Sequence, residues 1–238
     1  MTVSELVNCF SHSCVVAVSG NTSATYTICT VLLSSDRAIS EIKNGIIPSI
    51  KFLFLGEVIH LEIRKASKQD IADIAKVYVD GWRTTYRGLV PNQYLDELSY
   101  EEAEKRWNQF LDNENDPFMY VALNGEGKIV GFASGRSIEE KHFTGELYAL
   151  YLLQDCRGLG VGRQLVSAVA RHFKENGIHS MLVWVMEQNK SGLGFYKRMG
   201  GKEYIRRTST FGETVVDDVA YGWNDISVLY DEELNKTN

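Results

Sequence analysis

Cysteines are few and basic residues are outnumbered by acidic ones in this chain of 238 residues, and each of these facts argues against a class of protein. Only four cysteines occur and none forms a C-x-x-C pair, which argues against a disulfide scaffold and against structural zinc. Basic residues are outnumbered, 25 against 31 acidic ones, and the net charge of −6 argues against a broad surface for DNA or RNA. One small phosphate site remains compatible with that charge.

The chain also lacks a segment suited to cross a membrane. Its longest segment without Asp, Glu, Lys or Arg, residues 6–35, contains many Ser and Thr residues and is too polar for a spanning helix. No basic region precedes this segment, so it does not fit a secretory signal. We therefore expect a cytoplasmic protein that binds neither membranes nor nucleic acids.

Charge is distributed unevenly along the sequence. The first 60 residues carry seven charged side chains, whereas the rest of the chain carries 49. No helical or alternating pattern persists in the first 60 residues. We expect residues 1–60 to be an N-terminal extension outside the functional fold, either poorly ordered or upstream sequence included by an over-extended gene prediction; a short β-rich element is the alternative. The functional domain is expected at residues 61–225, followed by a polar tail at 226–238.

Regular patterns begin at Leu61. Ser67 starts an N-cap that precedes an apolar helical face ending at Trp82, and Ser99 starts a capping box before a second amphipathic helix. Strands are expected at residues 61–65, 118–123, 128–136, 146–153, 178–186, 202–211 and 214–223, with further helices after residue 160 and at 191–199. The predicted order, β-α-α-β-β-β-α-β-α-β-β, describes an α/β (α+β) fold.

A glycine-rich loop lies between an expected strand and an expected helix, with the sequence Arg157-Gly-Leu-Gly160-Val-Gly162-Arg163. Glycines let the backbone approach a ligand, and loop amides together with a helix N-terminus form an anion site. The predicted guest is a phosphate or a pyrophosphate. A Walker loop would end in Gly-Lys-Ser/Thr, and a dinucleotide fold would combine G-x-G-x-x-G with a βαβαβ order. Neither pattern matches this chain.

Three segments of this chain resemble motifs of the GNAT superfamily of acetyl-CoA-dependent N-acetyltransferases. They are Arg157-x-x-Gly160-x-Gly162, similar to the Q/R-x-x-G-x-G/A signature; residues 146–152, similar to the fourth strand; and residues 189–201, similar to the Asn…Phe-Tyr…Gly-Phe motif. The resemblance covers residues 61–224 and implies a mixed, mostly antiparallel central sheet flanked by helices. Three residues depart from the common pattern: Gln154, Cys156 and Gly201. These departures bear on the acceptor more than on the cofactor.

The resemblance implies that acetyl-CoA is the co-substrate and that no metal takes part. The loop amides would hold the pyrophosphate, two arginines would add positive charge, and the preceding strand would contact the pantetheine through its backbone. The expected cofactor-binding residues are Leu150, Tyr151, Leu152, Arg157, Gly158, Leu159, Gly160, Val161, Gly162, Arg163, Asn189 and Tyr196. A plain tight turn, a buried strand and a helix cap at Asn189 are the structural alternatives.

Two side chains are the catalytic candidates under this resemblance. Tyr196 is the predicted general acid, which protonates the departing thiolate. Glu146, at the start of the strand before the loop, is the predicted general base, acting through a water on an ammonium acceptor. Core packing of the tyrosine and an ordinary polar strand end for the glutamate are the alternatives.

The end of the first helix, with Trp82, Arg83 and Tyr86, is where this family builds its acceptor pocket, which implies that Trp82 and Tyr86 bind the substrate. Trp82 also lies on the apolar face of that helix, so core packing is the alternative that its position favours. The implied acceptor is a primary amine of a small molecule or a peptide, attacked directly in a ternary complex. Two other functions remain as alternatives: a non-catalytic acyl-CoA-binding module on the same fold, and a nucleotide-dependent oxidoreductase. The oligomeric state stays open, with a homodimer as one alternative.

Overall fold

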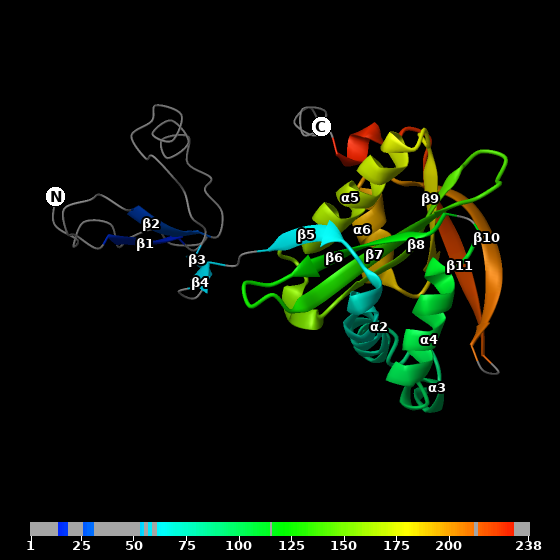
Figure 1. Ribbon diagram of the computed structural model, residues 1–238, viewed down its shortest axis with the longest axis horizontal. Coiled ribbons are helices and arrows are strands. Elements are labelled where there is room, and N and C mark those ends of the chain that lie inside the picture. Colours follow the sequence, from blue (N-terminus) through cyan, green and yellow to red (C-terminus); the bar gives the residue numbers. More distant parts are fainter. Residues whose placement is uncertain are drawn as a thin grey trace. The chain divides into compact units, whose positions relative to one another are not determined.

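A seven-stranded sheet organises the unit formed by residues 61–238 (Figure 1). The computed structural model describes residues 61–114, 116–211 and 214–230, together with four short strands within the first 60 residues. The sheet strands are β5 (Glu62–Lys65), β6 (Phe118–Leu123), β7 (Ile129–Ser137), β8 (Gly145–Leu152), β9 (Met181–Met186), β10 (Lys202–Phe211) and β11 (Thr214–Trp223). Their spatial order is β10-β11-β9-β8-β7-β6-β5, and among these described strands only β8 and β9 run parallel. The expected mixed, mostly antiparallel sheet is confirmed.

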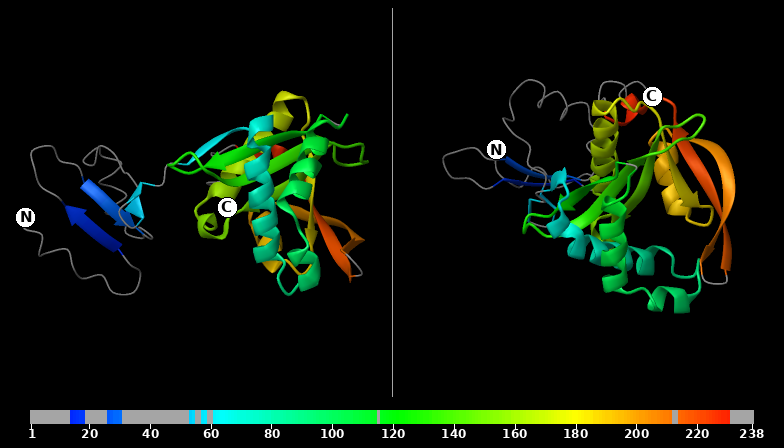
Figure 2. Two further views of the ribbon diagram at one scale, coloured as in Figure 1. Left: turned by 60° about the horizontal axis from the view of Figure 1, so that its bottom comes forward. Right: turned by 45° about the vertical axis from the view of Figure 1, so that its right-hand side comes forward.

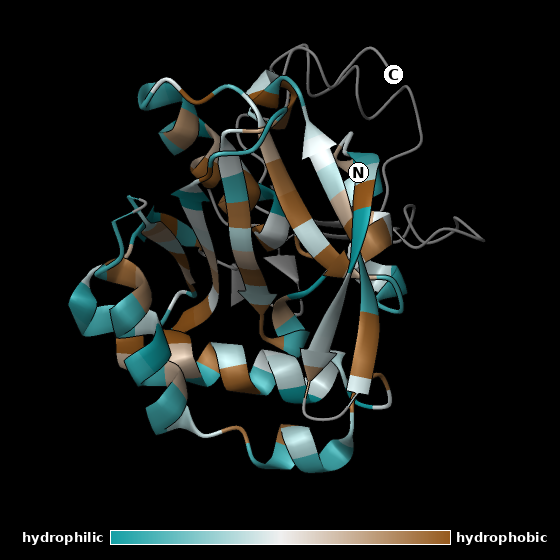
Figure 3. Cartoon of the chain, turned by 90° about the vertical axis from the view of Figure 1, so that its right-hand side faces the viewer, coloured by the Kyte–Doolittle hydropathy of each residue, from teal (hydrophilic) through white to brown (hydrophobic). Residues whose placement is uncertain are grey.

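Helices cover both faces of this sheet. They are α2 (Ile71–Thr85), α3 (Asn92–Asp96), α4 (Tyr100–Leu111), α5 (Val161–Glu175) and α6 (Lys190–Arg198), with short 3-10 turns η2 (Lys68–Asp70), η3 (Gln154–Cys156) and η4 (Ile226–Leu229). Helices α2 and α4 lie side by side (Figure 2) and form one hydrophobic cluster with the sheet. Helices α5 and α6 contribute to the other. Hydrophobic and hydrophilic residues alternate along the helices (Figure 3), as expected of helices that pack one side against a sheet.

Local sequence signals account for the helix starts. The Ser99 hydroxyl accepts a hydrogen bond from the Glu102 N–H, as expected of a capping box. At Ser67 the other half of a capping box is present: the Ser67 backbone N–H donates to the carboxylate of Asp70, three residues on, at 2.7 Å. Arg64 makes a bidentate contact with the same carboxylate and, by its hydrogen bonds, holds the pKa of Asp70 well below its usual range.

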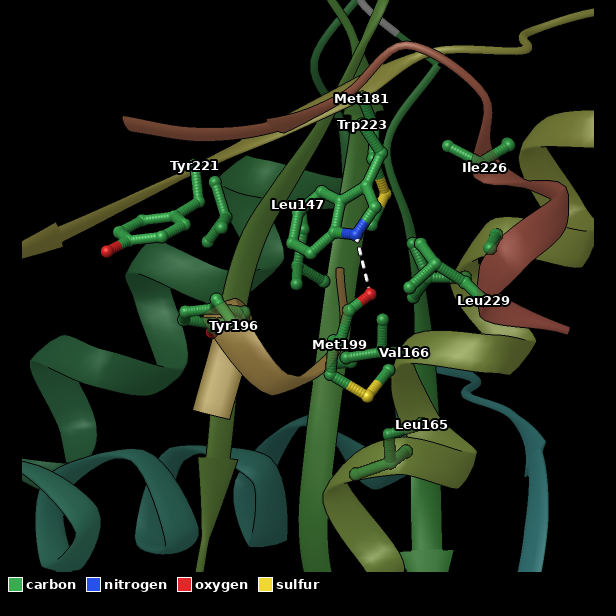
Figure 4. Packing of buried hydrophobic residues seen from close by; sticks show 14 of the residues in the cluster. Leu147, Leu165, Val166, Met181, Tyr196, Met199, Tyr221, Trp223, Ile226 and Leu229 are labelled. Carbon is green, nitrogen blue, oxygen red and sulfur yellow. Dashed lines mark hydrogen bonds between the residues drawn. The ribbon is translucent and has the colours of Figure 1, made fainter. Parts of the chain in front are cut away.

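Trp223, at the end of β11, is the centre of the α5-side core (Figure 4). Its side chain is 2% exposed, and its indole N–H donates to the Met199 carbonyl at 2.9 Å. A Cβ atom added at Gly201 would lie 2.8 Å from the Trp223 ring. The family's usual phenylalanine at that position is therefore excluded by Trp223, which occupies the space. This accounts for one departure from the family pattern.

The structure differs from the expected elements in three places. Helix α3 was not expected, and the strand predicted from residue 178 begins at Met181. The polar tail was placed at 226–238, but Ile226 and Leu229 are 1% and 4% exposed and belong to the α5-side core. The packed domain therefore extends beyond residue 225, because η4 supplies apolar side chains that cover α5. Residues 231–238 lie outside the described part of the chain.

The first 60 residues form a separate compact unit. Within it, β1 (Cys14–Val18) pairs antiparallel with β2 (Tyr26–Thr30), and β3 (Leu53–Phe54) pairs antiparallel with β4 (Glu57–Val58). The remaining residues of this segment lie outside the described part of the chain, so the expectation that the segment is not part of the functional fold stays a prediction.

A chain that starts at Leu61 is expected to remain folded with an unchanged melting temperature. The reason is that both hydrophobic clusters are built from residues 61–230. Thermal unfolding of the truncated and full-length proteins, compared at equal concentration, measures this. A drop in melting temperature of more than about 4 °C, the shift of roughly 1 kcal/mol for a domain of this size, would show that the first 60 residues stabilise the domain.

Candidate active site

Strands β8 and β9 diverge in the middle of the sheet. Within the described chain they pair only at Gly145–Met181 and Glu146–Leu182. On its other edge β8 remains paired with β7 as far as Leu152. The later part of β8 therefore directs backbone N–H and C=O groups into the opening between the two strands without a partner strand there. The divergence exposes the part of β8 whose backbone was expected to contact the pantetheine.

A cavity of about 330 Å³ occupies this opening. Backbone and side chains of β8, β9, α6, the end of α2 and the glycine-rich loop line it. Arg157, Arg163 and Arg198 are among the lining residues, whereas none of the described lining residues is Asp or Glu. The cavity therefore favours an anionic ligand by charge as well as by its backbone amides.

The glycine-rich loop has the conformation that an anion site requires. Gly158 and Gly160 have φ values of 77° and 80°, the left-handed region that favours glycine, and no atom lies within 4 Å of a Cβ added to either. Helix α5 starts at Val161, so the N–H groups of its first turn point out of the helix toward the loop. A Cβ at Gly162 would approach Leu152 and Phe195 to 3.3 and 3.4 Å, so a small residue lets α5 approach the end of β8.

Arg157 joins this loop to the last turn of α2. Its guanidinium donates to the Thr85 hydroxyl at 2.8 Å and to the Thr84 hydroxyl at 3.3 Å. The side chain also lines the cavity. Arg157 therefore fixes the position of the loop relative to the last turn of α2, in addition to contributing positive charge to the cavity.

Tyr196 lies on α6 and lines the cavity at the edge of the core (Figure 4). It is 7% exposed, and its ring packs against Phe195 and Trp223 with centroid distances of 5.1 and 6.2 Å. Burial raises the pKa of its hydroxyl well above the usual range, and Tyr86 adds to that effect. The hydroxyl therefore stays protonated at neutral pH, as a proton donor must.

Tyr86 and Asn189 both line the same cavity and interact with each other. Burial raises the pKa of Tyr86, and its interactions with Tyr151 and Asn189 lower it in part. The Asn189 side chain accepts a hydrogen bond from the Gly192 N–H at 3.0 Å, which makes it the N-cap of α6. Asn189 thus has both of its expected placements, as a helix cap and as a cavity residue.

Glu146 lies outside the cavity lining. It is 7% exposed, and its Oε2 accepts hydrogen bonds from Arg136 Nε and Nη2, both at 2.7 Å. Its Oε1 has no hydrogen-bond partner within the described chain. The Arg136 guanidinium also lies 4.6 Å from the centre of the Tyr148 ring, and Tyr148 does line the cavity. Two side chains, Arg136 and Tyr148, therefore connect Glu146 to the cavity, and one of its carboxylate oxygens is available.

Trp82 is part of an aromatic cluster that connects α2 to the far end of the β10–β11 hairpin. Its ring lies 4.4 Å from Tyr86, 5.9 Å from Tyr94 and 5.2 Å from Phe211. Trp82 is 6% exposed and does not line the cavity, whereas Tyr86 does. Of the two predicted acceptor residues, the structure therefore brings Tyr86 to the cavity and places Trp82 behind it. Arg83 instead donates to the Leu95 and Leu98 carbonyls.

Most of the predicted site residues converge on the cavity. Those lining it are Tyr86, Leu150, Tyr151, Leu152, Arg157, Gly158, Gly160, Gly162, Arg163, Asn189 and Tyr196. The predicted residues whose atoms do not line it are Trp82, Glu146, Leu159 and Val161. Sequence reasoning missed the lining residues Thr85, Tyr148, Ala149, Val183, Trp184, Val185, Ser191, Gly192, Phe195 and Arg198. Arg198 and Phe195 lie within the quoted Asn…Phe-Tyr motif, so proximity to Tyr196 was the available signal.

Comparison with known proteins agrees with this geometry. Residues 75–201 match the model of the acetyltransferase (GNAT) family. An uncharacterised N-acetyltransferase, YuaI, of Bacillus subtilis is 38% identical over 169 residues, which cover 70% of this chain and 95% of the relative. A spermidine N(1)-acetyltransferase of Thermoplasma acidophilum is 26% identical and covers 60% of this chain and 88% of its own length. The crystal structure of PaiA N-acetyltransferase from the same organism, in complex with coenzyme A, has a TM-score of 0.54, 24% identity, and coverage of 68% and 98%.

Proposed function

The chain belongs to the acetyltransferase (GNAT) family, and on that premise we propose that it transfers an acetyl group from acetyl-CoA to the primary amine of a small molecule or peptide. The observation that carries the proposal is one cavity that is lined by the glycine-rich loop, by the unpaired edge of β8 and by Tyr196. Among the described helices, none is long and apolar enough to cross a membrane.

The glycine-rich loop is proposed to bind the pyrophosphate of acetyl-CoA. Gly158 and Gly160 leave open space where other residues would carry a side chain, and the first turn of α5 supplies N–H donors. Arg157 and Arg163 add positive charge at the same place. Arg198, which sequence reasoning missed, is a further cation on the cavity wall.

The unpaired edge of β8 is proposed to bind the pantetheine arm and the thioester. Leu150 and Leu152 line the cavity beyond the point where β9 diverges. A backbone N–H there would donate to the thioester carbonyl oxygen, on which negative charge develops during attack. Direct attack then forms the bond between the amine nitrogen and the carbonyl carbon, and the C–S bond breaks.

Tyr196 is proposed to protonate the sulfur that leaves. A thiol has a pKa near 8.5 and a tyrosine near 10 in water. Burial raises the pKa of Tyr196, but the same burial also penalises the thiolate and raises the thiol pKa, which keeps the two groups matched. An ammonium acceptor loses two protons in all. The first leaves before attack, to the proposed base, and the second leaves the nitrogen after attack and restores the proton that Tyr196 gave to the sulfur.

Glu146 is proposed to accept the proton from the amine through a water. Its Oε2 is held by Arg136 and its Oε1 has no partner within the described chain, so a water that donates to Oε1 would link it to the cavity beside Tyr148. Because the contact is indirect, Tyr196 is the residue on which the proposed chemistry depends most.

Glu146→Gln is expected to slow acetyl transfer most at low pH, by roughly 10²-fold, the lower end of general-base effects. The loss should shrink as the pH approaches the pKa of the acceptor amine, because the neutral amine then needs no base. Single-turnover acetyl transfer measured between pH 6 and 10 tests this. The exposed Glu139→Gln is the matched control. A loss that is the same at every pH would assign Glu146 a structural role.

The alternative function is a non-catalytic acyl-CoA-binding module. Both functions predict acetyl-CoA binding, so binding alone does not separate them. Release of free CoA from acetyl-CoA should be measured with a panel of polyamines, amino acids, aminoglycosides and peptides with free N-termini. Amine-dependent CoA release supports the proposed activity. Tight acetyl-CoA binding without release for any acceptor would favour the binding module.

A further inference from the structure

Arg106 is a guanidinium without an acidic partner on the α2-side face of the sheet. It lies on α4 between Ala103 and Phe110, which are both buried, and it is itself exposed. Its Nη1 donates to the Tyr78 hydroxyl at 3.3 Å. Within the described chain no carboxylate oxygen lies within 4.0 Å of it.

Three tyrosine hydroxyls surround this guanidinium. Interaction with Tyr78 raises the pKa of Arg106 most, and Tyr148 and Tyr94 add to the effect. Burial raises the pKa of Tyr78 to about 12, so this phenol remains neutral. Neutral hydroxyls orient a guanidinium but leave its positive charge uncompensated.

Two carboxylates of the sheet strands already have partners. Glu146 is bound by Arg136. Asp218 accepts hydrogen bonds from Arg207 and Ser209, and it lies on the same face of β11 as Val216, which belongs to the α2-side cluster. Neither carboxylate therefore pairs with Arg106.

Tyr148 connects Arg106 to the cavity. Tyr148 lines the cavity, and its ring stacks on Phe110 of α4 at 4.7 Å, one helical turn after Arg106. Tyr78, which accepts the Arg106 hydrogen bond, has its ring 5.1 Å from the ring of Tyr151, a second cavity residue. Tyr148 lies two residues before Leu150 on β8, a rise of roughly 7 Å along a strand. The chain then runs through Leu152 to the glycine-rich loop, so Tyr148 lines the cavity away from the proposed pyrophosphate site, and Arg106 lies behind that end, outside the residues that line the cavity.

We infer that the acceptor carries a carboxylate close to its amine, as a free amino acid does, and that Arg106 binds this carboxylate while the amine faces the thioester beside Leu150. The inference rests on the proposed acetyl transfer and adds the substrate class. A guanidinium that is free of acidic partners offers the planar fork that binds carboxylates in two-point contact. A polyamine acceptor would instead place a second cation next to Arg106 without a free carboxylate to receive it.

The first test compares matched pairs of acceptors. The 20 common L-amino acids and their carboxamides are each incubated with the full-length protein and acetyl-CoA, with spermidine alongside. At least one amino acid is expected to be acetylated with a kcat/KM at least tenfold above that of its carboxamide. Equal or better transfer to carboxamides or to spermidine would overturn the carboxylate site but leave acetyl transfer intact. No transfer to any of these amines would overturn the inference, and it would contradict the proposed function as well if aminoglycosides and peptides with free N-termini were also not acetylated.

The second test uses Arg106→Gln on the best amino-acid acceptor. KM for that acceptor is expected to rise about 10- to 100-fold, the loss typical of a hydrogen bond to a charged group. The kcat value and the affinity for acetyl-CoA should change little, and KM for the matching carboxamide should not change. Arg106→Lys should recover only part of the loss, because it keeps the charge without the fork.

Lys105→Gln is the matched control, since Lys105 is an exposed cation on the same helix whose partner is Glu102. It should leave KM unchanged for both acceptors. Melting temperatures confirm that each variant is folded. Equal increases in KM for the amino acid and for its carboxamide in Arg106→Gln would show that Arg106 only supports the tyrosines around it, and would overturn the inference.

Discussion

Tyr196→Phe is expected to reduce the single-turnover rate of acetyl transfer roughly 10²- to 10⁴-fold, the range of general acid catalysis. The substitution keeps the ring and so keeps its packing against Phe195 and Trp223. It removes only the hydroxyl, the group that lies at the cavity and would protonate the leaving sulfur. The affinity for acetyl-CoA should therefore change little.

The pH dependence adds a second expectation for Tyr196. Because burial raises the pKa of this hydroxyl above its usual value, the donor keeps its proton through the whole neutral range. The wild-type single-turnover rate should therefore show no loss from tyrosine ionisation below about pH 10, the pKa of an unperturbed tyrosine. An alkaline decline near pH 8 or 9 would have to arise from another group.

Single-turnover measurements are needed, because slow release of product can hide a change in the chemical step. Tyr204→Phe is the matched control, since Tyr204 lies exposed on the edge strand β10. It should leave the rate unchanged. If Tyr196→Phe transfers acetyl groups at the wild-type rate, Tyr196 is a core residue, and catalysis depends on positioning by the loop and by β8.

The sequence was sufficient to predict elements that local patterns determine. The two helix N-caps, the hairpins and the strand–loop–helix around Gly160 all depend on residues a few positions apart, and the structure contains them. Helix α3 was missed because five residues, Asn92–Asp96, are too few to show a helical period. The burial of Ile226 and Leu229 was missed because η4 depends on contact with α5, far away in the sequence.

The acceptor side was less predictable for a physical reason. Strand β8 has an irregularity opposite Ser134–Gly135, so Tyr148 and Ala149 are neighbours that both belong to the α2-side cluster. Simple alternation would place them on opposite faces. An inserted residue of this kind redirects side chains at a functional edge, and no pattern in the sequence marks it. Tyr148 was therefore absent from the predicted site.

Gly160→Glu is expected to weaken acetyl-CoA binding by about 10²- to 10³-fold. Two effects act at this position, the first on the stability of the loop and the second on acetyl-CoA binding. With φ at 80°, any side chain strains the loop, by roughly 1–2 kcal/mol. The carboxylate would also lie against the proposed pyrophosphate site, where like charges about 4 Å apart repel by roughly 4 kcal/mol at an effective dielectric constant of 20. Isothermal titration with acetyl-CoA measures the loss directly.

The two effects can be separated, because the chain contains a matched glycine outside the site. Gly127, in the turn between β6 and β7, has a φ of 76° and open space around its Cβ position, and it does not line the cavity. Gly127→Glu should lower the melting temperature about as much as Gly160→Glu does, but should not change acetyl-CoA affinity. Gly160→Ala should lower the melting temperature through the strain in the loop, but it adds no charge that repels the pyrophosphate. Unchanged affinity in a folded Gly160→Glu protein would show that the pyrophosphate binds elsewhere, and the loop would then be only a tight turn before α5.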